Sequence, residues 1–162
     1  MKNQKKGFSL IELLIVVAII LIIAAIAIPN LLRAKAAANE SSAVATLRTY
    51  NTAIVAYENL YQTAPTTDMS QLGPFAAGGK PSAVSADLVD NLIGKVDACK
   101  SNYCFGYAPT VAADGTVSFW NITAGPTSPV NGQKTFFMDQ SGVIRYRTDS
   151  GPATVTDTPI GG

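Results

Sequence analysis

The feature that most constrains this chain is an apolar run close to its amino terminus. Between Phe8 and Ile28 every residue is apolar except Ser9 and Glu12, and nothing polar interrupts the run from Leu13 onward. As a helix, this segment would be roughly 32 Å long, close to the bilayer hydrocarbon thickness of about 30 Å. Leucine, isoleucine and valine dominate it and favour insertion by roughly 4 to 7 kcal/mol, more than one acid near an end costs. We therefore expect a transmembrane segment.

Composition excludes several classes of function. Only 14% of the 162 residues are charged, against roughly 25% in soluble domains, so a disordered charged chain is excluded. Twelve basic residues balance eleven acidic ones, which argues against a nucleic-acid partner. The chain contains no histidine, the commonest general base and nitrogen ligand for metals. With no nucleophile–base set and no phosphate-binding loop, we expect neither an enzyme nor a cofactor.

The charges that flank the apolar run do not decide whether this segment is retained or cleaved off. Residues 1–7 contain three lysines and no acid, which favours a cytoplasmic amino end, although Arg33 and Lys35 beyond the run weaken this asymmetry. One interpretation is a plain membrane anchor. Another is a cleaved secretory signal, because residues 25–27 have the small-x-small form of a cleavage site. Glu12 inside the apolar region argues against the secretory signal.

A third interpretation accounts for more residues. Residues 5–14 read KKGFSLIELL, which resembles the prepilin segment of type IV pilins and type II secretion pseudopilins. The resemblance extends over about residues 5–36: a basic leader, Gly-Phe, one acid at a fixed offset, the apolar run and a proline. It implies a pilin-like α+β fold, in which a long amino-terminal helix, transmembrane in its first half, packs on a small antiparallel sheet.

The resemblance also implies roles for individual residues. A prepilin peptidase would remove the leader by cutting between Gly7 and Phe8, and Phe8 would then be N-methylated. Glu12 would then be the fifth residue of the mature chain. It would be an assembly residue that pairs with the amine of a neighbouring subunit, since an unpaired acid in hydrocarbon is costly. The alternative for Glu12 is that it snorkels to the lipid headgroups.

Two residues bear on the course of this helix. Pro29 removes a backbone donor and clashes with the preceding turn, so we expect a kink there and count Pro29 as an assembly residue. Family members often carry glycine where this chain has Leu21, a better helix former by roughly 0.8 kcal/mol. The helix should therefore persist toward Pro29, or unwind only in the turn before it.

Beyond the apolar run, the pattern predicts that the same helix continues to about Tyr61. The segment from Leu31 has no glycine or proline, and its apolar residues recur every three or four positions until Ala64-Pro65 ends it. The carboxyl half can pack on a sheet, whereas the amino half can be buried only by lipid or by copies of itself. We thus expect four parts: a leader at 1–7, a transmembrane and assembly helix at 8–29, the amphipathic half of the same helix at 30–62, and a globular head at 63–162.

The globular head reads as a loop region followed by two hairpins. Turn signals separate runs with strand character, which predicts an antiparallel sheet of about four strands at 103–109, 116–123, 135–139 and 143–147. A short helix is expected around 86–96, and the Thr-, Pro- and Gly-rich tail from Thr148 is expected to be loosely ordered.

Cys99 and Cys104 should form a disulfide if the head is exported. Two sulfurs without histidine make a metal site improbable, and the spacing is not that of a Cys-x-x-Cys redox pair. Asp139, Asp149 and Asp157 suggest calcium at first sight, but no spacing selects it and we interpret them as solvated turn acids.

These observations favour a structural function. The expected protein is a subunit of a type IV pilus filament, a homo-oligomer held together by the amino-terminal helix. The resemblance implies a precursor in the inner membrane, an assembly platform there, and finally an extracellular fibre. The alternatives are a type II secretion pseudopilin in a periplasmic pseudopilus, a minor pilin, and a membrane-anchored binding module that never polymerises.

Overall fold

The computed structural model describes residues 8–149 and 151–161. The leader and its expected cleavage residue Gly7 lie outside the described residues. Residues up to Lys35 form one compact unit and residues from Ala36 form a second. A single helix, α1 (Leu10–Tyr61), contributes to both.

Helix α1 ends where the sequence predicts. Gln62 adopts a left-handed conformation with φ of 61°, and its N–H donates to the Glu58 carbonyl at 2.8 Å, which closes the last turn. Ala64 and Pro65 follow, and a proline cannot extend the helix. The helix is continuous through Leu21 and Pro29, so of the two expected outcomes it persists toward Pro29 and does not unwind in the turn before it.

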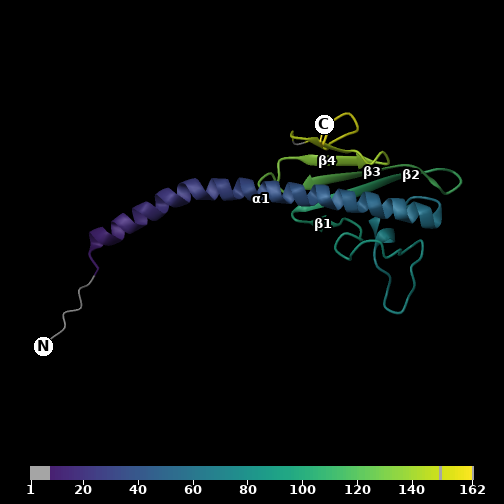
Figure 1. Cartoon of the computed structure of the whole chain (residues 1–162), viewed down its shortest axis with the longest axis horizontal. Helices are drawn as coiled ribbons and strands as arrows, with labels where there is room; N and C mark the ends of the chain where they lie inside the picture. The colour runs from purple at the N-terminus through teal and green to yellow at the C-terminus, as the bar shows by residue number, and fades with distance from the viewer. Residues whose placement is uncertain (1–7, 150, 162) are drawn as a thin grey trace. The chain divides into compact units, whose positions relative to one another are not determined.

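The head contains an antiparallel sheet with strands in sequential order, shown with α1 lying across it in Figure 1. Its six strands are β1 (Cys99–Lys100), β2 (Tyr103–Val111), β3 (Val117–Pro126), β4 (Thr135–Asp139), β5 (Ile144–Arg147) and β6 (Thr158–Pro159). The predicted number, about four, was therefore wrong. The four expected strands are β2 to β5, whereas β1 and β6 are two-residue strands, too short to show an alternating pattern.

The core lies between the sheet and the carboxyl half of α1. Helix residues Leu47, Tyr50 and Ile54 are fully buried, together with Ile122 and Met138 from the sheet. Burying each such side chain contributes about 1.5–3 kcal/mol. The sheet therefore has the cover for one face that an isolated antiparallel sheet lacks.

The expected helix at 86–96 is absent and this prediction was wrong. The segment is instead a series of turns whose N–H groups bond to a different part of the chain: those of Leu88 and Val89 both donate to the Leu72 carbonyl. Leu72 ends a short 3-10 helix, η1 (Met69–Leu72), which the sequence did not predict. Tertiary backbone hydrogen bonds thus replace those of a local helix.

The expectation of a loose carboxyl-terminal tail was also wrong for its described part. Ala153 is buried, and β6 pairs with β5. The Arg147 side chain donates to the Asp157 carboxylate at 3.1–3.2 Å, and the Thr154 N–H donates to the same carboxylate at 2.7 Å. This charged cluster holds the tail on the sheet.

Candidate assembly site

The first turn of α1 contains the acid on which the sequence analysis depends. Glu12 lies in that turn, and its Oε2 accepts a hydrogen bond of 2.9 Å from the backbone N–H of Ser9, the residue before the helix. Such a bond satisfies one of the amide donors that a helix start leaves free, and the carboxylate also interacts favourably with the helix dipole. Glu12 is therefore held at the helix start.

Sequence reasoning missed this local role of Glu12. Ser9-x-x-Glu12 has the spacing of a capping box, a recognised signal for a helix start. The carboxylate thus has a partner within its own chain, and it remains exposed at the end of the rod. Phe8, the residue expected to carry the methylated amine, is 86% exposed.

The apolar part of α1 has no cover in the isolated chain. Its large side chains are exposed around the whole circumference, from 44% at Val17 to 74% at Leu10. By length and composition, α1 is the one helix among the described residues that could cross a membrane. A rod that is apolar on all sides is stable in lipid or against other apolar helices, not in water.

Both cysteines are used as the sequence predicts. Cys99 and Cys104 form a disulfide between directly paired residues of β1 and β2. The bridge attaches the two-residue strand β1 to the sheet. The following turn, at Ser101 and Asn102, has positive φ at both positions.

Three tyrosines of the core and its margin fix the loop region in place. The Tyr50 hydroxyl donates to the Ile93 carbonyl at 2.8 Å, that of Tyr57 to Ala83 at 2.5 Å, and that of Tyr107 to Pro65 at 2.7 Å. Burial raises the pKa of the Tyr50 and Tyr107 hydroxyls well above the ordinary value. Nothing in the pattern of these residues foretold which carbonyls they bind.

The three late aspartates are not equivalent, and the expectation that all are solvated was wrong. Asp139 is buried and accepts bonds from the Ser141 N–H and hydroxyl, and Asp157 is held by Arg147. Only Asp149 has a mostly exposed side chain, at 71%. Within the described ranges, no three acids, cysteines or histidines are grouped as metal ligands.

Comparisons with known proteins identify the family. A family model described as the prokaryotic N-terminal methylation motif matches residues 2–28. Over 107 residues the chain is 36% identical to the type IV wide pilus major component PilA4 of Thermus thermophilus, across 64% of this chain and 72% of that protein. The chain belongs to the type IV pilin family.

A second pilin relative is similar over a shorter region. This is the type IV major pilin protein PilA of Myxococcus xanthus, 52% identical over 50 residues, across 31% of this chain and 23% of that protein. No solved structure gives a significant match. Both relatives are named as major components of type IV pili, so the resemblance to type IV pilins is confirmed, and the pseudopilin alternative is not favoured.

Proposed function

We propose that this chain is the major structural subunit of a type IV pilus. The observation that carries the proposal is its similarity to a wide pilus major component along most of that protein's length. The uncovered apolar rod at residues 10–28 supports it, because a rod of this kind needs lipid or sister helices around it. The chain acts as a building block, and no catalytic role is assigned to it.

In this proposal the precursor first sits in the inner membrane through α1. A prepilin peptidase cuts between Gly7 and Phe8 and leaves the apolar run attached to the mature protein. An assembly platform then moves the subunit from lipid into a filament that ends outside the cell. Leaving lipid costs little when neighbouring helices replace the hydrocarbon, because helices in apolar surroundings associate by close packing.

Glu12 selects the alignment of neighbouring helices in this account. Two opposite charges about 4 Å apart gain about 4 kcal/mol at an effective dielectric of 20, whereas an unpaired acid among apolar side chains is costly. The Ser9 N–H holds the carboxylate at the helix start. It can therefore meet the Phe8 amine of a neighbour without first refolding the turn.

Deletion of the gene, followed by electron microscopy of surface fibres, tests the proposal. The expected result is loss of the fibres and their return when the wild-type gene is supplied. Fibres that persist in the deletion strain, together with a defect in protein secretion, would instead support the pseudopilus.

A further inference from the structure

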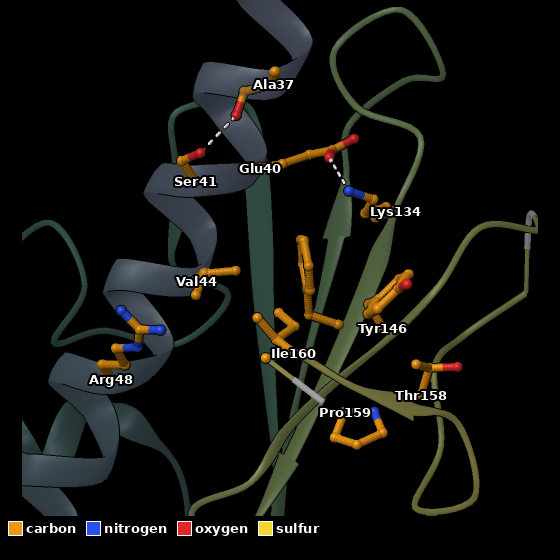
Figure 2. A pocket seen from close by; sticks show the side chains of 12 residues that line it. Ala37, Glu40, Ser41, Val44, Arg48, Lys134, Tyr146, Thr158, Pro159 and Ile160 are labelled. Atoms are coloured by element: carbon orange, nitrogen blue, oxygen red, sulfur yellow. Dashed lines mark hydrogen bonds and ion pairs between the residues drawn. The ribbon is translucent and has the colours of Figure 1, made fainter.

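A groove runs along the head between α1 and the last strands of the sheet. It has a volume of about 540 Å³, within the range of sites that hold another molecule or several side chains. On the helix its wall is a single stripe formed by Ala37, Ser41, Val44 and Arg48, and Figure 2 shows Val44 pointing from the helix toward Ile160 and Tyr146.

The groove has an apolar floor and a positive rim. Phe136 and Ile160 contribute apolar surface, and the Lys134 ammonium bonds Glu40 at 3.2 Å while it lies 5.4 Å from the centre of the Tyr146 ring. Arg48 is exposed and, among the residues described, has no carboxylate within 4 Å. The one acid in the groove is thus already paired, and a positive charge is left over.

The loop at residues 84–97, here named the acidic loop, has complementary properties. Val84, Leu92 and Val96 are 74%, 46% and 58% exposed, so the loop presents three large apolar side chains to solvent. The loop contains three exposed aspartates, at positions 87, 90 and 97, and one lysine, at position 95. Its net charge is therefore negative.

The acidic loop is held in a defined shape. The Tyr50 hydroxyl bonds the Ile93 carbonyl, and the Asp90 carboxylate accepts from the N–H groups of Leu92 and Ile93. A surface ordered in advance loses less conformational entropy when it binds. Its exposed apolar residues are therefore suited to recognition.

The groove and the acidic loop lie on opposite sides of α1. On one side Glu40 bonds Lys134 next to β4, and on the other the Tyr50 hydroxyl bonds the Ile93 carbonyl of the acidic loop. Figure 1 shows the loop region and the carboxyl-terminal tail on these two sides. When two different surfaces of one chain bind each other, repetition produces an open helical polymer and not a closed dimer.

We propose that the groove of one copy receives the acidic loop of a second copy, with Arg48 facing its aspartates and Leu92 resting on the apolar floor. This inference rests on the proposed function, because it describes a contact between heads in the filament. It adds a contact between exported heads to the contact between apolar helices.

Cross-linking in fibres tests the contact. Full-length chain carrying Ser41→Cys and Leu92→Cys is assembled in cells, and sheared fibres are treated with a short bis-maleimide. Both native cysteines are in the disulfide, so they do not compete for the reagent. The expected result is a ladder of covalent multimers from the double variant and only monomer from either single variant, because the two surfaces differ. A ladder or dimer from one single variant would overturn the proposal.

The matched control pairs Ser41→Cys with Ala113→Cys, an exposed position in the β2–β3 turn. Wild-type-like fibres with no ladder from the first pair, or an equal ladder from the control pair, would overturn the head contact and leave the proposed function intact. Absence of wild-type fibres would instead remove the proposed function.

Charge reversal gives a second test that needs no cysteine. Arg48→Glu should lower fibre yield and Arg48→Lys should keep it, with the loss greatest at low salt, where charge repulsion is least screened. Equal yields from the two variants would contradict the assigned role of Arg48.

Discussion

The Ser9 N–H donates a 2.9 Å hydrogen bond to the Glu12 carboxylate of its own chain. A carboxylate in this position can serve two purposes: it completes the start of a helix, and it presents a negative charge to the expected amine of a neighbouring subunit. The first purpose needs only a hydrogen-bond acceptor, whereas pairing with an amine needs charge. Substitutions at Glu12 can therefore separate the two.

Glu12→Gln keeps an acceptor for the Ser9 N–H and removes the charge. We expect fibre yield to fall at least about tenfold, equivalent to about 1.4 kcal/mol, while the protein remains in the membrane fraction. Fibre yield is measured by immunoblot of sheared material. Ser9→Ala is the matched control, because it leaves the backbone donor in place and should assemble well. Normal fibres from Glu12→Gln would mean that Glu12 is only a helix cap.

Tyr50→Phe removes the hydroxyl that holds the Ile93 carbonyl. We expect a loss of about 1–3 kcal/mol in the free energy of unfolding, because a buried carbonyl is left without its partner. Denaturant unfolding of the full chain in detergent measures this. Tyr61→Phe is the control: Tyr61 is only half-buried, so a much smaller change is expected. Equal effects would show that the hydroxyl of Tyr50 contributes nothing specific.

Gly94→Ala should destabilise the head by about 1–3 kcal/mol through overpacking. A Cβ on Gly94 would collide with the Cα of Gly73 and approach the Val89 side chain to 2.9 Å, so backbone must move. Gly125→Ala is the matched control, because nothing lies within 4 Å of its Cβ position. Thermal unfolding of both variants compares them, and a Gly94→Ala melting temperature equal to that of Gly125→Ala would contradict this packing.

Asp157 makes the attachment of the tail sensitive to acid. Hydrogen bonds from Arg147, followed by those from Thr154, hold the pKa of this carboxyl below its ordinary value. Its contribution to stability is therefore present above the pKa of an unfolded aspartate, about 3.9, and is lost as the pH falls below that value. Asp157→Asn should lower stability at neutral pH and reduce the further loss of stability on acidification. Denaturant midpoints measured against pH check both effects.

Asp149→Asn is the control for that series. It changes the same charge beside the same arginine, but its side chain is 71% exposed and its 3.5 Å ion pair is longer. Exposed pairs contribute about 0–1 kcal/mol. If the loss of stability on acidification is reduced equally in both variants, Asp157 has no special role.

The parts of the fold that sequence predicted well depend on long periodic patterns. The helix end at Tyr61 and the four strands β2 to β5 follow from regular apolar spacing and turn residues. The two edge strands escaped prediction because two residues have no period. Strand β1 is attached to the sheet by the Cys99–Cys104 disulfide, and β6 is held by the Arg147–Asp157 pair.

Prediction of the candidate sites divides in the same way. The local sequence of residues 8–28 is enough to predict a transmembrane and assembly segment. Even the cap by Glu12 could have been anticipated from Ser9-x-x-Glu12. The groove could not, because it combines Arg48 on α1 with Lys134 and Ile160, which are distant in sequence. The segment 86–89 depends likewise on the carbonyls of residues 71–73, which only the folded chain brings near.

The central claim is that the mature subunit keeps its apolar helix after processing and that this helix builds the fibre. Intact-mass spectrometry of fibres sheared from cells tests it most directly. The account predicts a chain that begins at Phe8, lacks residues 1–7 and carries one added methyl group. Fibres composed of chain that retains the leader, or of chain that has lost the apolar helix, would contradict it.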